Sequence, residues 1–125
     1  MTIRELVRIL DGEVVSAEDK LDQVVDDFAA TDLLSDVLAV GKENFALLTG
    51  LTNAQILRTA QVTNARCVVI VRNKQPQPEA VDVARRSGIP LILSPFNMYE
   101  ACARLGSFVE KHDGRVPQAP DPSDP

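Results

Sequence analysis

The strongest constraint on this sequence is a regular alternation of apolar runs and helical patterns from residue 45 onward. The apolar runs stand at 45–48, 67–71 and 89–93, and each is followed by a helical pattern, at 53–63, 77–87 and 97–111 respectively. Each run is continuously apolar, which is typical of strands that are buried on both faces. The sequence therefore predicts an α/β fold, a layered sandwich with a central, mainly parallel sheet flanked by helices.

Residues with known helix-end preferences mark the boundaries within this alternation. Asn53 is a suitable N-cap, Pro78 suits a first helical turn, and Gly88 suits a left-handed position after a helix. Asn97 and Glu100 are spaced as a capping box. These signals agree with the helical patterns and strengthen the prediction of repeated strand-helix units.

The first part of the chain gives weaker signals. Thr2 and Glu5 form a second capping box, ahead of a helical pattern at 3–10. A short strand is predicted at 14–15. The segment 21–25 suits a short strand as well as a turn of helix, and both readings stay open.

A further helix is predicted at 32–40, with Asp32 as its N-cap and Gly41 at its end. Asp32 and Asp36 are four residues apart and share a helix face, a spacing that can hold a cation. The alternative is that Asp32 only caps the helix and Asp36 is a solvated or dimer-facing charge. We interpret Asp32, Ser35 and Asp36 as a hypothetical partner or dimer face.

The net charge of −5 argues against nucleic acid as a partner, because a phosphate backbone would be repelled. The charge is unevenly placed. Residues 11–36 hold nine acidic residues and Lys20 as their one base, whereas residues 45–78 hold four bases and no acid. A small anion or an acidic protein surface therefore remains a possible partner.

No targeting pattern follows Met1, and no apolar segment approaches the roughly 20 residues of a membrane span. We therefore expect a cytoplasmic protein that does not enter a membrane.

Cys67 and Cys102 are expected as free thiols in a strand and a helix, with no disulfide or metal site. The proline-rich stretch 112–125 is predicted to be a disordered tail after a domain at 1–111.

The sequence offers no catalytic grouping, so we expect a protein that is not an enzyme and has no cofactor. The one histidine, His112, falls in the predicted tail, where a surface position is expected. The pair Gly41-Lys42 has Asp36 where a phosphate-binding loop would have its first glycine, and Glu43 where it would have Ser or Thr.

Polar residues follow all three predicted strands of the alternating region. In an open parallel sheet, ligands bind at the carboxyl ends of the strands, so these residues could bind a phosphate or carboxylate if the strands are neighbours. The alternative is that they only cap helices and solvate loops. The candidate ligand-binding residues are Thr49, Gly50, Thr52, Asn53, Arg72, Asn73, Lys74, Ser94 and Asn97.

The sequence resembles the DRTGG domain family, which includes the N-terminal domain of HPr kinase/phosphorylase and stand-alone forms. The resemblance lies in the segments 28–39, 48–50, 88–94 and 98–101, and Asp32 to Val37 is its most specific block. Two family motifs are altered. Thr52-Asn53 stands in place of Asp-Arg, and Val71-Arg72-Asn73 stands in place of Thr-Gly-Gly.

The resemblance implies an HPr kinase N-terminal-domain-like fold and a non-catalytic regulatory module that forms a homodimer. Such a module would bind a small anionic metabolite or nucleotide, or dock onto a metabolic enzyme complex, and stand-alone members suggest a hydrogenase-linked setting. Two alternatives stay open. One is a phosphotransferase subunit that uses Thr49, Ser94 or Asp36 in a site completed by a partner, and the other is a purely structural dimeric adaptor.

Overall fold

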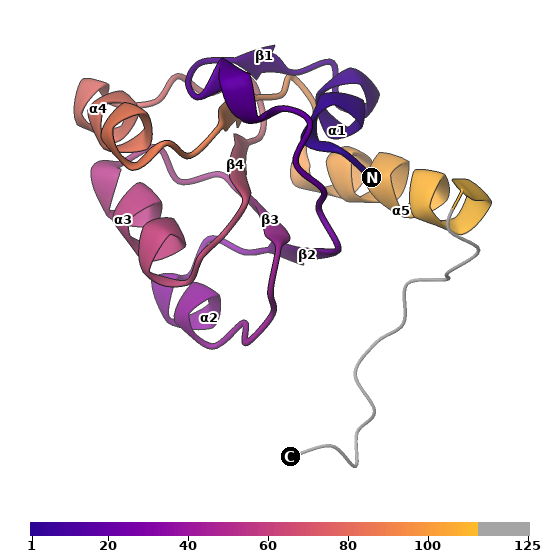
Figure 1. The fold of residues 1–125 in the computed structure, drawn as a ribbon, viewed down its shortest axis with the longest axis horizontal. Helices are drawn as coiled ribbons and strands as arrows, with labels where there is room; N and C mark the ends of the chain where they lie inside the picture. The colour runs from indigo at the N-terminus through magenta and orange to yellow at the C-terminus, as the bar shows by residue number, and fades with distance from the viewer. Residues whose placement is uncertain (113–125) are drawn as a thin grey trace.

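A computed structural model describes residues 1–112 as one sheet covered by helices on both faces (Figure 1). The sheet has five strands in the order β1-β5-β4-β3-β2, and β1 alone runs antiparallel to its neighbour. The predicted fold class is confirmed. The strands are β1 (Glu13–Val14), β2 (Asp27–Ala30), β3 (Phe45–Thr49), β4 (Cys67–Ile70) and β5 (Leu91–Leu93).

The helices are distributed over the two faces by the order of the strands. From β2 to β5, each parallel strand is added on the same side of the previous one. Right-handed crossovers therefore place the connecting helices on one face of the sheet. These are α2 (Leu34–Leu38), α3 (Ala54–Val62) and α4 (Pro78–Ser87). The opposite face is covered by α1 (Ile3–Ile9) and α5 (Met98–His112), as Figure 1 shows.

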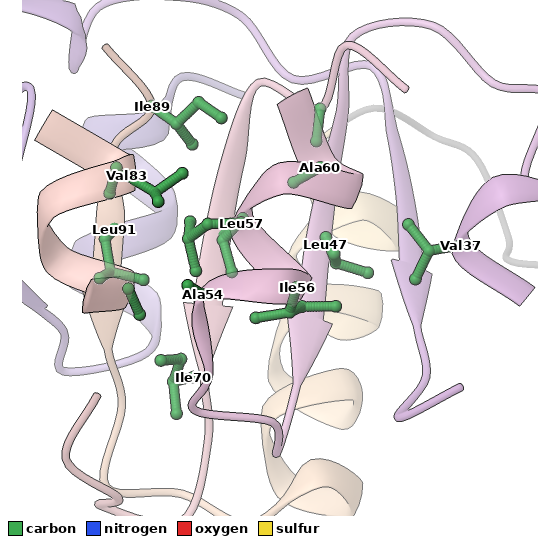
Figure 2. Close-up of a cluster of buried hydrophobic side chains, with 14 of the residues drawn as sticks. Val37, Leu47, Ala54, Ile56, Leu57, Ala60, Ile70, Val83, Ile89 and Leu91 are labelled. Carbon is green, nitrogen blue, oxygen red and sulfur yellow. The ribbon is translucent and has the colours of Figure 1, made fainter. Parts of the chain in front are cut away.

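Two apolar clusters hold the layers together, because successive strand residues point to opposite faces. On β3, Phe45 and Leu47 face α2, α3 and α4, whereas Ala46 and Leu48 face α1 and α5. Figure 2 shows the first cluster, in which Ile56 and neighbouring side chains of α3 pack over the strands. All five β3 residues are buried, as the continuous apolar run predicted.

The strands and helices of the alternating region agree with the sequence prediction within two residues. Asn53 caps α3 through a hydrogen bond from the Ile56 N–H, and Gly88 ends α4 with φ of 69°. The Thr2-Glu5 capping box is present in full. At the predicted Asn97-Glu100 box, Asn97 accepts from the Glu100 N–H at 2.8 Å, while the Glu100 carboxylate pairs with Arg104.

The largest differences from the sequence prediction lie between residues 18 and 40. A short 3₁₀ helix occupies Glu18–Lys20, and the ambiguous segment 21–25 forms a turn in which Val24 bridges to Thr2. The strand β2 was not predicted, because Ala29 and Ala30 are weak strand formers at a half-exposed sheet edge. The helix predicted at 32–40 forms over a shorter stretch, the five residues of α2.

Two predicted placements at helix ends are wrong. Leu33, not Asp32, is the N-cap residue of α2, and it makes no side-chain capping bond because Asp32 bonds to β3 instead. His112 is the last residue of α5, stacked on Phe108 with 4.1 Å between ring centroids, although its expected exposure holds. The rest of the predicted tail lies outside the described residues.

Candidate functional site

The carboxyl ends of β3, β4 and β5 lie side by side, because these strands are neighbours in the sheet. The three polar segments that follow them are therefore brought to one edge. The backbone joins two of these segments directly. Arg72 N–H donates to the Phe96 carbonyl at 2.7 Å, and Asn73 N–H donates to the Ser94 carbonyl at 2.9 Å.

Gly50 lies at the centre of this edge, between two charged side chains. Its N–H donates to Asp32 Oδ1 at 2.6 Å, and its carbonyl accepts from Lys74 Nζ at 3.0 Å. A Cβ atom at this position would lie 3.3 Å from both Asp32 oxygens and 3.4 Å from Lys74 Nζ. Glycine thus allows a carboxylate from the β2 end and an ammonium from the β4 end to approach the same peptide.

The Thr49 hydroxyl belongs to the same arrangement. It is buried, donates to Asp32 Oδ1 at 3.2 Å and accepts from the Leu51 N–H at 3.1 Å. The Thr49 hydroxyl, the Gly50 N–H and the Lys74 ammonium form a set of three donors, which we call the strand-end cradle. Donors of this kind suit an anionic oxygen.

Arg72 and Asn73 follow β4 in consecutive left-handed conformations, with φ of 67° and 56°. Both side chains are exposed. These are the positions at which the family resemblance implied two glycines, and glycine adopts such φ values without strain. The turn therefore has a backbone conformation that glycine adopts easily, although it carries an arginine and an asparagine.

The side chains of Asn53, Ser94 and Asn97 are used to hold the backbone. Ser94 is buried; its hydroxyl donates to the Leu10 carbonyl at 2.9 Å and accepts from the Phe96 N–H at 3.3 Å. Asn53 and Asn97 each accept from a backbone N–H of the helix that they precede. Thr52 accepts from the Gln77 N–H through its carbonyl.

The residues assigned to a partner face are divided by the structure. Asp32 is directed to the strand-end cradle, whereas Ser35 and Asp36 are exposed on α2. Asp36 accepts from the Thr31 hydroxyl at 3.2 Å. The flanking Leu33 and Leu38 are 61% and 60% exposed, so α2 presents apolar and acidic groups to solvent together.

Asp32 lies at this edge, although its sequence context predicted a helix N-cap and a partner face. Its position was missed because the strand β2 was not predicted. Since β2 runs parallel to β3, Asp32 follows the carboxyl end of a strand at the same edge of the sheet. The hollow of about 410 Å³ between β1, β5 and the start of α4 was also not anticipated. Its charged lining residues are Glu13, Asp82 and Arg85.

The two cysteines are free thiols at separate places, as predicted. Cys67 is buried in β4, and burial raises the pKa of its thiol to about 12. Cys102 is exposed on α5, and partial burial of its sulfur raises its pKa above the ordinary value. In the part of the chain that the structure describes, no cluster of three His, Cys, Asp or Glu residues could hold a metal ion.

The fold and this edge define the class of the molecule, a three-layer α/β domain with a mainly parallel sheet and polar strand ends. The sequence model of the DRTGG domain matches residues 5–108, and the chain belongs to the DRTGG domain family. The predicted family is therefore confirmed. No match was found among curated proteins.

A solved structure with the same fold is the CBS and DRTGG domains of the regulatory region of Clostridium perfringens pyrophosphatase, complexed with its activator diadenosine tetraphosphate. The TM-score is 0.68 at 14% sequence identity, and the similarity covers 83% of this chain and 45% of that one. The chain thus spans less than half of that structure, and the likeness establishes the fold. Among residues 1–112, no helix has the length and apolar character needed to span a membrane.

Proposed function

We propose that this chain is a regulatory module that binds a small anionic metabolite or nucleotide at the carboxyl ends of β3 and β4. The observation that carries the proposal is the strand-end cradle, in which the Thr49 hydroxyl and the Gly50 N–H donate to the same oxygen and the Lys74 ammonium lies beside Gly50. The exposed side chains of Arg72 and Asn73 stand on the same edge and would contact the outer part of a ligand. Thr52, Asn53, Ser94 and Asn97 support the loops around it.

A binding role agrees better with the geometry than a phosphotransferase role. The hydroxyls of Thr49 and Ser94 are buried, and each is engaged both as a donor and as an acceptor. A nucleophile would need a free, activated hydroxyl next to its substrate. The activator complex of the pyrophosphatase regulatory region supports nucleotides as the first ligands to test here.

The test is calorimetric titration of the full chain with AMP, ATP, acetyl phosphate and diadenosine tetraphosphate. We expect the double variant Arg72→Gln/Lys74→Gln to bind about tenfold more weakly than the native chain, because two charged donors are lost. The matched control is Arg86→Gln/Lys111→Gln, which removes the same charge at the C-terminal ends of α4 and α5. Equal weakening by both variants would refute the proposal.

We also propose that the chain forms a homodimer through α2, that it docks onto an enzyme, and that it acts in the cytoplasm. Support for the α2 surface comes from the exposed Leu33 and Leu38 beside the exposed Ser35 and Asp36. Light scattering at micromolar concentration should give twice the chain mass. Leu33→Ser/Leu38→Ser should lower it to the monomer value, whereas Val62→Ser, at another exposed apolar residue on α3, should not.

A further inference from the structure

The Asp32 carboxylate occupies the place at which the proposed anion would bind. Its Oδ1 atom accepts from the Gly50 N–H at 2.6 Å and from the Thr49 hydroxyl at 3.2 Å. A phosphate or carboxylate oxygen of a ligand would use these same two donors. A ligand therefore cannot enter the strand-end cradle while Asp32 holds them.

The Lys74 ammonium borders the same small space but does not form an ion pair with Asp32. Its Nζ atom donates to the Gly50 carbonyl at 3.0 Å, and none of the ion pairs within residues 1–112 includes Lys74 or Asp32. Asp32 is thus bound by neutral donors alone. An anion that also bonds to the ammonium would make a charge-assisted contact that Asp32 lacks.

Asp32 can leave the cradle without unpacking the core. Its side chain is exposed, and it lies in the link between β2 and α2. The short helix that follows has Val37 as its one buried residue. Displacing the carboxylate therefore removes two hydrogen bonds from the link and leaves the apolar clusters in place.

We propose that Asp32 is a built-in occupant of the anion site, and that an anionic ligand binds by replacing it. This inference rests on the proposed ligand site and adds the competition within it. While Asp32 occupies the site, only the fraction of molecules with a free site can bind the ligand. The apparent affinity is the intrinsic affinity multiplied by that fraction. Removing Asp32 should consequently tighten anion binding, although it also removes two hydrogen bonds from the protein.

The experiment is a titration of the full chain with pyrophosphate, in which binding is monitored through the NMR chemical shift of the Gly50 amide. We expect Asp32→Ala to bind pyrophosphate about tenfold or more tightly than the native chain. Asp36→Ala is the matched control, because it removes the same charge four residues away, from α2. The affinity of this control for pyrophosphate should rise less than about threefold, which is the part of the effect due to general charge repulsion.

Two further variants make the test specific. Asp32→Ala/Lys74→Gln should lose the gained affinity, because the ammonium no longer contacts the anion. Asp32→Asn keeps an oxygen that can accept from the Gly50 N–H, and it replaces the alanine variant if that variant does not fold. Because its side chain is neutral, this variant should also bind pyrophosphate more tightly than the native chain does. Equal affinities of the Asp32 and Asp36 variants would overturn the proposal, as would tighter binding that leaves the Gly50 amide unshifted.

The two proposals fail in different ways. Native binding at the Gly50 amide with no gain in either Asp32 variant would leave the ligand site standing and remove the competition. If neither the native chain nor any Asp32 variant binds pyrophosphate or the four ligands tested above, both proposals are refuted.

Discussion

At the scale of single residues, Gly50 determines how closely the strand-end charges can approach. The missing side chain leaves room for the Asp32 carboxylate on the N–H and for the Lys74 ammonium on the carbonyl. Gly12 has a different reason to be glycine. A Cβ there would lie 2.6 Å from Cγ2 of Ile92, which is fully buried in β5.

These two glycines predict opposite sensitivities to alanine. Gly50→Ala meets only the ends of flexible side chains, so the free energy of unfolding should stay within about 1 kcal/mol of the native value. Gly12→Ala overpacks the core and should cost about 1–3 kcal/mol. Urea denaturation measures both values, and a larger loss at Gly50 than at Gly12 would contradict this account of the edge.

Arg72 holds a left-handed conformation with φ of 67°, which is unfavourable for a residue with a side chain. Arg72→Gly should therefore raise the free energy of unfolding by about 1 kcal/mol. The same variant removes a proposed ligand contact and should weaken anion binding. Thermal unfolding with and without ligand separates the effects. Arg72→Val, with a β-branched side chain, should destabilise the protein, and a stability gain from it would argue against strain.

The two thiols should differ in reactivity because they differ in burial. Burial raises the pKa of the Cys67 thiol to about 12, so very little of the reactive thiolate is present at neutral pH. Cys102 is exposed on α5 and should be alkylated first. Mass spectrometry of the native chain should find label on Cys102 alone, with Cys67 labelled only in denaturant. Early labelling of Cys67 would mean that β4 opens readily.

At the scale of elements, the Thr2-Glu5 capping box makes the stability of the helix α1 depend on pH. The Thr2 N–H donates to Glu5 Oε1 at 3.0 Å, and this bond holds the pKa of the Glu5 carboxyl below its ordinary value of 4.5. Because the folded pKa is the lower one, the stabilisation is fully present above pH 4.5. It is lost as the pH falls through the folded value.

Glu5→Gln should accordingly destabilise the protein at pH 7, and the difference from the native chain should shrink below pH 4.5. Denaturant unfolding at a series of pH values measures the difference. Thr2→Ala, which removes the capping hydroxyl, should cost about 1 kcal/mol at neutral pH. A Glu5→Gln effect that is the same at pH 3 and pH 7 would exclude the carboxylate as its cause.

Elements were predictable where burial is complete and hard to predict where it is partial. The β3 and β4 runs are buried at every residue, so composition alone indicated them. β2 is half-exposed at the sheet edge, and its register is set by pairing with β3, which local sequence does not encode. The same omission displaced Asp32 from the candidate ligand site to a helix cap.

At the scale of the whole molecule, the strand order determines which residues can cooperate. The polar segments at 49–53, 72–74 and 94–97 were visible in the sequence, but their contact depends on the order β5-β4-β3. The uses of individual side chains also required the structure. For example, nothing in the sequence indicates that the Ser94 hydroxyl donates to Leu10, more than eighty residues away.

The edge strand β2 would be open to pairing with another chain, since parallel sheets end in unsatisfied backbone groups. Lys42 lies across this edge. Its ammonium donates to the Phe28 carbonyl at 3.0 Å and pairs with Asp27 at 3.1 Å. A single lysine thus discourages the sheet from growing sideways, and chemical neutralisation of that amine should leave this flank more open to self-association.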